Sequence, residues 1–295
     1  MDFAAQELRV IADYSQDENM LACFVGDNKK DMHLLTALGI LRQMDEYRGL
    51  TYAGSEILRQ ADAGRGLTYA GLVAGYEDRN SPDYSNFKDA RTLGKKTNFT
   101  SEYGAMAPKL AQTLLVSEEI AQGYLDAREE AFPQAKAWKE GVIADAKAAG
   151  VVRTKMGAVR HLADAFMSSD RQTSSRAERQ SVNFKVQSSS AEMTKLALGA
   201  MYRANLIARF DCQFYFPVHD EVVWSCTIED LEGFIPAAHE CMVRAYADMS
   251  VPIISSIAFG KSFGPSDQIE IGEEPTAKAV QEGLAKMRVQ SALAA

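Results

Sequence analysis

Apolar residues recur every three or four positions over most of this chain, a spacing that predicts helices. Shorter runs with strand-like alternation predict β-strands. The predicted helices cover residues 7–12, 18–24, 118–131, 138–149, 191–206 and 228–249, with a further helix from 277. The predicted strands cover 151–155, 210–218, 221–226 and 251–259. The polar segment 171–179 is expected to be partly loop.

Several helix ends carry signals in the sequence. Capping residues occur at Ser117 and at Ser15–Glu18, and Thr227–Asp230 resembles a capping box. Phe132-Pro133 should end one helix, and Gly150 suits the position just after the next one. A direct repeat, Arg48–Gly54 and again Arg65–Gly71, has too few copies for a solenoid. We interpret it as a local duplication within a surface insertion.

One stretch carries a stripe of cations followed by aromatics. Arg91, Lys95, Phe99 and Tyr103 are spaced four apart, so on a helix their side chains share a stripe about 18 Å long. The cations lie toward the helix N-terminus, where the helix dipole also favours phosphate. A nucleoside triphosphate has the same polarity, with a polyanion at one end and a flat base at the other. The alternative is a solvated helix with basic residues in its first half.

His219-Asp220-Glu221 falls between two predicted strands, at the tip of a hairpin. A carboxylate held there suits a metal ion, and a second carboxylate on a neighbouring strand would complete a two-metal site. Asp2 is the candidate for that second ligand. The alternative for Asp220 is an ordinary turn residue, because Asp is favoured in tight turns.

A third polar stretch precedes the helix predicted at 191–206. Long polar side chains recur here, among them Arg179, Asn183 and Gln187, and such side chains can donate hydrogen bonds into a DNA minor groove. The alternative is a polar loop with a helix cap. The net charge of −8 argues against a nucleic-acid partner for the chain as a whole. Residues 151–185, however, hold seven Lys or Arg against three Asp or Glu, which provides a local basic surface.

Composition excludes several other classes of protein. A hydrophobic fraction of 46% is that of an ordinary globular protein with one large or two modest cores. We expect no membrane partner and no signal peptide, because polar residues interrupt every apolar run. The four scattered cysteines predict a reduced, cytoplasmic protein, and the histidine spacing argues against zinc.

Taken in order, these blocks resemble the C-terminal polymerase core of the family A (DNA polymerase I-like) DNA polymerases. Asp2–Arg9 is similar to the family's first palm motif, Arg91–Gly104 to its fingers helix, and His219–Glu221 to its third motif. Residues 132–157 with Arg160, and residues 177–193, also follow the family pattern. The resemblance implies an α+β fold with a mainly helical fingers subdomain inserted in an antiparallel-sheet palm. The implied parts are palm 1–30, fingers 31–150 with an insertion at about 42–86, palm 151–264 and a C-terminal tail 265–295.

The resemblance also implies a function, template-directed transfer of a nucleotide from a dNTP to a primer 3′-hydroxyl. Asp2 and Asp220 would bind two Mg²⁺ ions, with Glu221 as a supporting carboxylate. The implied nucleotide-binding residues are Arg91, Lys95 and His33 on the triphosphate, Phe99 on the sugar and base, Tyr103 at the insertion site, and Glu7 as the steric gate against a ribose 2′-hydroxyl. The implied contacts to primer-template DNA are Arg160, Arg179, Asn183, Gln187 and His219.

Some family features have no counterpart in these residues, namely the thumb, the exonuclease domain and the palm segment before the first motif. We therefore expect a truncated product or one half of a split polymerase, completed by an N-terminal partner chain that also anchors Asp2. A bacteriophage origin, and so a host cytoplasm, is expected from the short core. Thr100, Ala158, Val159 and Ser188–Ser190 also depart from the family pattern. The alternatives are a non-catalytic DNA-binding remnant or accessory subunit, and a metal-dependent phosphohydrolase.

Overall fold

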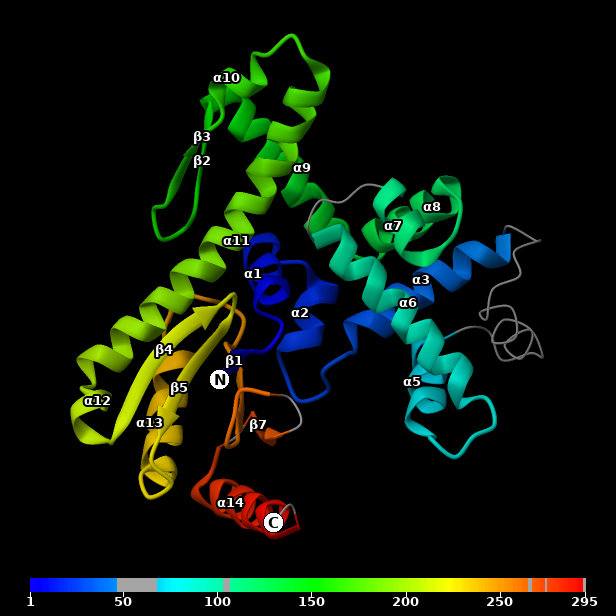
Figure 1. Cartoon of the computed structure of the whole chain (residues 1–295). Helices are drawn as coiled ribbons and strands as arrows, with labels where there is room; N and C mark the ends of the chain where they lie inside the picture. Colours follow the sequence, from blue (N-terminus) through cyan, green and yellow to red (C-terminus); the bar gives the residue numbers. More distant parts are fainter. Residues whose placement is uncertain (47–67, 103–106, 265–266, 274, 294–295) are drawn as a thin grey trace. The chain divides into compact units, whose positions relative to one another are not determined.

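A computed structural model of the chain describes residues 1–46, 68–102, 107–264, 267–273 and 275–293 (Figure 1). Residue contacts divide it into two compact units. The first unit comprises Met1–Val10, Arg153–Ala158 and Lys185–Ala295, and the second comprises Ile11–Val152 and Val159–Phe184. The division into palm and fingers is a functional one and stays a prediction. Within the described residues, no helix is long and apolar enough to cross a membrane.

The first unit is built on a five-stranded antiparallel sheet in the order β4-β5-β1-β6-β7 (Figure 1). Its strands are β1 (Asp2–Phe3), β4 (Cys212–Val218), β5 (Glu221–Cys226), β6 (Ser255–Phe259) and β7 (Ile269–Gly272). The predicted hairpin is confirmed. Strand β6 begins later than predicted, because Pro252 has no backbone N–H for a ladder. Strand β7 lies in the C-terminal tail, where the sequence predicted a helix from residue 277 but no strand.

Strand β1 is only two residues long, yet it lies in the middle of this sheet. Asp2 pairs with Glu221 of β5 on one side and with Ser256 of β6 on the other. The N–H of Phe3 donates to the carbonyl of Asp220 at 3.2 Å, and the Phe3 side chain is 1% exposed. Asp2 is therefore held by pairing on both sides, without the anchor from a partner chain that the sequence led us to expect.

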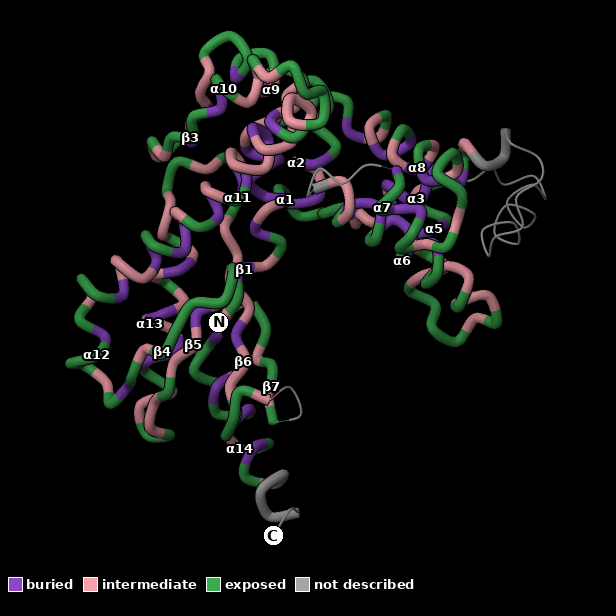
Figure 2. The backbone as a smooth tube through the Cα atoms, turned by 45° about the horizontal axis from the view of Figure 1, so that its top comes forward, coloured by how far each residue is buried: buried purple, intermediate pink, exposed green. Residues whose placement is uncertain are grey.

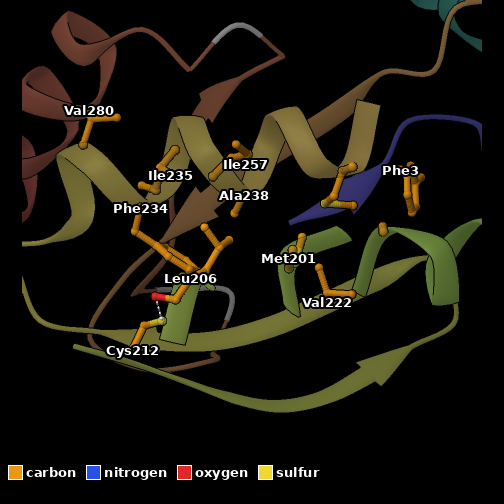
Figure 3. Packing of buried hydrophobic residues seen from close by; sticks show 12 residues of the cluster. Phe3, Met201, Leu206, Cys212, Val222, Phe234, Ile235, Ala238, Ile257 and Val280 are labelled. Carbon is orange, nitrogen blue, oxygen red and sulfur yellow. Dashed lines mark hydrogen bonds between the residues drawn. The ribbon is translucent and has the colours of Figure 1, made fainter. Parts of the chain in front are cut away.

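Helices complete the core of the first unit, as Figure 3 shows at close range. The helices that contribute to it are the end of α11 (Arg171–Arg203), α12 (Leu206–Arg209), α13 (Leu231–Val243) and α14 (Ala277–Leu293). The predicted capping box before α13 is wrong. The Asp230 carboxylate accepts from the backbone N–H of Asp211 at 2.7 Å and makes no cap hydrogen bond to α13, which begins at Leu231. Helix α14, with buried Val280 and Met287, confirms the predicted C-terminal helix.

The second unit is mainly helical. Its elements are the end of α1 (Gln6–Ser15), α2 (Glu18–Phe24), α3 (Met32–Glu46), α5 (Tyr69–Glu77), α6 (Tyr84–Glu102), α7 (Ala107–Leu114), α8 (Glu118–Ala131), α9 (Pro133–Ala149), β2 (Val151–Arg153), β3 (Val159–His161), α10 (Ala163–Phe166) and the start of α11. Ser117 caps α8, α8 ends before Phe132-Pro133, and Gly150 closes α9 with a φ of 68°, all as predicted, but α9 begins at Pro133, five residues earlier than expected. Helix α2 is capped by Asp17, within the predicted capping stretch Ser15–Glu18, because the Asp17 carboxylate accepts from Met20 N–H.

Helix α11 overturns the expected loop at 171–179, because it runs unbroken for 33 residues from Arg171. Asp170 caps its start by accepting from the backbone N–H groups of Gln172 and Thr173. Ala177 and Ser181, both buried, lie four residues apart and give this polar stretch an inward face. Tertiary packing thus stabilises a helix that the pattern of hydrophobic residues does not predict.

Helices α3 and α6 pack closely, and α3 is buried along much of its length (Figure 2). A methyl group on Gly94 would lie 2.0 Å from the carbonyl oxygen of His33, so only glycine allows this approach. Helix α5 joins them through buried Leu72, in a cluster with Leu34 and Leu38. This end of the predicted surface insertion therefore forms part of a core, while residues 47–67, with the first repeat copy, lie outside the described residues.

Candidate active site

Three of the four stripe residues, Arg91, Lys95 and Phe99, are described in the structure, and all three lie on α6 in the second unit. Lys95 and Phe99 are exposed, with the Lys95 Nζ 5.7 Å from the centroid of the Phe99 ring. The His33 ring, at the start of α3, lies 6.0 Å from the same Phe99 ring. Arg91 lies one turn before Lys95, and Tyr103 falls outside the described residues. Three cationic or polar groups and one aromatic ring thus border a common exposed face.

Arg91 is held by a carboxylate that the sequence analysis did not single out. Its Nε donates to Asp31 Oδ2 at 2.7 Å, with both side chains roughly a quarter exposed. The other oxygen, Asp31 Oδ1, accepts from the backbone N–H groups of His33 and Leu34, which caps α3. The sequence carries a signal for this role, because an Asp directly before an apolar run occupies a position that caps a helix. Asp31 therefore fixes Arg91 at the start of α3, beside His33.

The His33 side chain is a neutral imidazole, and its hydrogen bonds define which ring nitrogen carries the proton. Burial is the largest cause that lowers the pKa of His33 to about 4; Asp31 opposes the shift, and Arg91 and Lys95 add to it. The Asn98 amide nitrogen lies 3.1 Å from His33 Nδ1. Asn98 Oδ1 accepts from Thr36 and Arg128, so the amide nitrogen must be the donor to His33. The ring proton therefore resides on Nε2, where it can be donated to an anion.

The carboxylates gather in the first unit, around the hairpin tip. Asp2 and Glu221 are direct partners in the sheet, and directly opposite side chains lie on the same face. Partial burial, then the charges of Asp220 and Glu221, raise the pKa of Asp2 to about 6. Burial and then the Asp220 charge raise the pKa of Glu7, while His219 opposes that rise. His219 has a φ of 54°, a left-handed conformation that turns the chain between β4 and β5.

This carboxylate group fits a magnesium ion by its chemistry. Asp2 and Asp220 offer hard oxygen ligands and repel one another, and a divalent cation would offset that repulsion. Within the described part of the chain, no three His, Cys, Asp or Glu side chains form a closed metal cage. Mg²⁺ commonly binds through one or two carboxylates and completes its shell with water and substrate phosphates. The pair therefore suits an ion that takes its remaining ligands from water or from a bound anion.

The remaining predicted residues lie on α11, on β3 and at the hairpin tip. Arg179, Asn183 and Gln187 occupy successive turns of one side of α11. Arg160, on β3, is exposed and lies with its Cζ 5.9 Å from the Phe184 ring centroid. His219 is exposed at the tip of the hairpin. The three α11 residues thus share one helix face, although the sequence predicted a helix only from residue 191.

The raised pKa of Asp2 predicts a pH-dependent stability in the absence of metal. A carboxyl group with a higher pKa in the folded state binds its proton more tightly there than in the unfolded chain, where the value is near 3.8. Its contribution to stability is therefore present below pH 3.8 and is lost as the pH rises to about 6. Asp2→Asn should remove this loss from a plot of melting temperature against pH. The exposed Asp248→Asn is the control, and identical pH slopes for wild type and Asp2→Asn would contradict the prediction.

Comparison with known proteins places this fold and these motifs in one family. The model of DNA polymerase family A matches residues 80–265. The chain is 26% identical over 268 residues to the thermostable DNA polymerase I of Thermus aquaticus and 27% identical over 262 residues to DNA polymerase I of Bacillus subtilis. Each alignment covers 89% of this chain, and 26% and 25% of these relatives. The chain thus spans about a quarter of the length of the curated relatives it matches.

A solved structure shares the fold. The POL domain of Pol1 from M. smegmatis, in complex with DNA primer-template and dNTP, has a TM-score of 0.65 and 22% sequence identity. The match covers 85% of this chain and 37% of the other. The predicted α+β class, with its antiparallel sheet and helical part, is confirmed by the structure and by this neighbour. Because the family model covers more than half of the chain, this chain belongs to DNA polymerase family A.

Proposed function

We propose that this chain is the palm-and-fingers part of a DNA-directed DNA polymerase, which transfers a nucleotide from a dNTP to a primer 3′-hydroxyl. The observation that carries the proposal is the grouping of Asp2, Asp220 and Glu221 around one hairpin tip, in a chain of this family. The neighbouring structure holds primer-template DNA and dNTP, the same classes of ligand.

In this proposal Asp2 and Asp220 hold two Mg²⁺ ions, and Glu221 supports them from the same face of the sheet. When bound, the ions supply electrostatic stabilisation of the charge that develops on the transferred phosphoryl group. The chain's own part is positioning, which provides much of the catalysis in phosphoryl transfer. Glu7, near the Asp220 charge, limits the space beside the sugar and so excludes a ribose 2′-hydroxyl.

The stripe of α6 binds the incoming nucleotide. Arg91 and Lys95 neutralise the triphosphate, and His33 donates its Nε2 proton to the same phosphates. Phe99 packs against the sugar and base, and Tyr103 stacks at the insertion site. Because Asp31 already holds Arg91, the triphosphate must compete with that carboxylate for the guanidinium.

The primer-template runs along the side of α11. Arg179, Asn183 and Gln187 donate to groove acceptors near the primer end, where A·T and T·A pairs present the same pattern. Arg160 and His219 bind the DNA backbone. These contacts test the shape of the duplex and do not read its sequence.

A second polypeptide completes the enzyme in this proposal. The chain spans about a quarter of its relatives' length, and the family resemblance implies a thumb and a longer palm in the working polymerase. We infer a protein partner that carries them and works with this chain in the cytoplasm. The relatives named above are bacterial, and a bacteriophage origin stays a prediction.

Primer extension tests the proposed function. The chain is incubated with a labelled primer-template, dNTPs and Mg²⁺, alone and with a polypeptide that supplies thumb and palm edge. We expect templated extension that EDTA abolishes and added Mg²⁺ restores. The second candidate function, DNA binding without catalysis, is favoured by the basic segment 151–185. It would be supported if primer-template binds tightly but no combination of chains extends the primer.

Two adjacent lysines of α6 provide a matched test of the nucleotide site. Lys95 and Lys96 are both exposed, but only Lys95 lies on the stripe with Phe99. Lys95→Ala should weaken dNTP binding roughly tenfold or more, since a charged hydrogen bond contributes about 1.5–3 kcal/mol. Lys96→Ala should leave it unchanged. Equilibrium dialysis with labelled dNTP measures both, and equal losses in the two variants would contradict the assignment.

A further inference from the structure

Two cysteines face each other across the β4–β5 hairpin. The register pairs Cys212 of β4 with Cys226 of β5, at the end of the hairpin away from the His219–Glu221 turn. Directly opposite side chains lie on the same face of a sheet, and both cysteines pack in the hydrophobic cluster of the first unit. Both are free thiols in the structure. The proposed function makes no use of this pair.

Backbone hydrogen bonds show which kind of cross-strand pair this is. In an antiparallel ladder, pairs that exchange backbone hydrogen bonds alternate with pairs that do not. The residues next to the cysteines are bonded, because Thr227 N–H donates to the Asp211 carbonyl at 3.0 Å. On β5, Val222 N–H donates away from β4, to the Met1 carbonyl, and the same orientation recurs at every second residue as far as Cys226. The cysteines therefore form a non-hydrogen-bonded pair.

This type of pair suits a disulfide bond. In a regular ladder its Cα atoms are about 4.5 Å apart, roughly 1 Å closer than in a hydrogen-bonded pair. Disulfides span Cα separations of about 4.4–6.8 Å, so neither strand has to move. One sulfur has to turn, because Cys212 Sγ donates to the Leu206 carbonyl at 3.6 Å, as Figure 3 shows. Little is lost in that turn, since a thiol is a weak donor.

The two thiols differ in their access to solvent. Cys212 is 9% exposed, whereas Cys226 is only partly buried. Burial raises the pKa of Cys226 to about 12, and the charges of Cys212, Asp230 and Asp211 add to the rise. Burial and the same two aspartates also raise the pKa of Cys212. At neutral pH both groups are therefore protonated, and an oxidant that needs a thiolate reacts with them slowly.

We propose that Cys212 and Cys226 are a modification site, a dithiol that hydrogen peroxide converts to a reversible cross-strand disulfide. The more accessible Cys226 loses its proton and attacks one peroxide oxygen, which gives a sulfenic acid and a hydroxide that takes up that proton as water. The Cys212 thiol then attacks the sulfenic sulfur, so that the S–S bond forms and a second water leaves. The peroxide is thus reduced to water, and the two thiols are oxidised to one disulfide.

The second cysteine makes the oxidation reversible. A sulfenic acid without a neighbouring thiol is oxidised further to sulfinic acid, which thiols do not reduce. Cys212 intercepts the sulfenic acid before that step. A disulfide at the short end of the usual Cα range is also readily reduced. Because β5 begins at Glu221, the pair would spare a strand of the candidate active site from permanent oxidation.

Mass spectrometry after peroxide treatment tests the site. The full chain is treated with millimolar hydrogen peroxide at mildly alkaline pH, blocked with iodoacetamide and cleaved after Glu221, which separates the two cysteines. We expect a linked Cys212–Cys226 peptide pair, which dithiothreitol returns to two thiols. A cross-link between any other two cysteines, or between two copies of the chain, would overturn the proposal.

Cys241 of α13 is the matched control. Like Cys226 it is partly buried in the first unit, and burial raises its pKa too, but its place on a helix gives it no cross-strand partner. Peroxide should therefore carry Cys241 to sulfinic acid, which dithiothreitol does not reverse. Oxidation of Cys241 while Cys226 stays a thiol would overturn the proposal.

Removing the resolving thiol provides a second test. In Cys212→Ala, Cys226 should follow the irreversible course of Cys241, and dithiothreitol should recover at least about tenfold less of its thiol than in the wild type. Equal recovery in both proteins would overturn the proposal. The wild-type cross-link map needs no variant, so it decides the matter even if Cys212→Ala does not fold. Both tests work without DNA or nucleotide and are independent of the proposed function.

Discussion

Asp220→Ala is expected to lower the rate of primer extension by at least about 10³-fold, because it removes one of two carboxylates proposed to hold the metal ions. Primer-template affinity should change little, since Asp220 repels DNA and donates no hydrogen bond to it. A rapid-quench assay of single-nucleotide addition measures the rate, and a filter-binding assay measures the affinity.

The exposed Asp248→Ala, in the same unit, is the matched control and should extend primers at the wild-type rate. A second readout does not depend on catalysis. Because the Asp220 charge raises the pKa values of Asp2 and Glu7, Asp220→Asn should lower both in an NMR titration without metal. Wild-type extension by Asp220→Ala would remove the basis of the proposed metal site.

Phe3→Ala is expected to destabilise the first unit by about 3–5 kcal/mol, the range for a buried phenylalanine truncated in a packed core. Phe3 is 1% exposed and lies in the core of the sheet. The change should also loosen β1 and with it Asp2, so metal-dependent activity should fall further than the loss of folded protein explains. A urea titration followed by tryptophan fluorescence measures the stability.

The two tryptophans allow that measurement to be confined to one unit. In a Trp138→Phe background, Trp224 of β5 reports on the first unit alone. Tyr202→Ala is the control, because this aromatic side chain is 81% exposed in the same unit and should cost within about 0.5 kcal/mol. Equal midpoints for Phe3→Ala and Tyr202→Ala would show that β1 does not depend on its buried side chain.

The sequence correctly predicted those helix ends that depend on interactions between neighbouring residues. The cap at Ser117, the Phe132-Pro133 break and the Gly150 terminus each depend on a few neighbouring residues, and all are confirmed. The start of α11 was missed because its inward face uses small and polar residues. The start of α13 was misplaced because Asp230 bonds to a distant backbone group, Asp211, which no local pattern reveals.

In the candidate site, too, local features were predicted and long-range contacts were not. The stripe of α6 and the acidic hairpin tip could be predicted from the sequence, because each lies within a single helix or hairpin. The contacts that orient their members were not, since Arg91 with Asp31 and His33 with Asn98 require α3 to pack on α6. That packing depends on Gly94, whose significance appears only when both helices are in place. Sequence therefore supplied the prediction of which side chains act, and tertiary contacts show how Arg91 and His33 are held.

The two-residue strand β1 has a consequence for the order in which the protein is made. Met1 pairs with a residue 221 positions further along the chain. At about 5–20 residues per second, the ribosome needs roughly 10–45 s to synthesise that partner. During this time the first residues have no ladder to join, and Phe3 has no core. The proposed metal site is therefore expected to be among the last parts of the nascent protein to form, although Asp2 is translated long before its partners in the sheet.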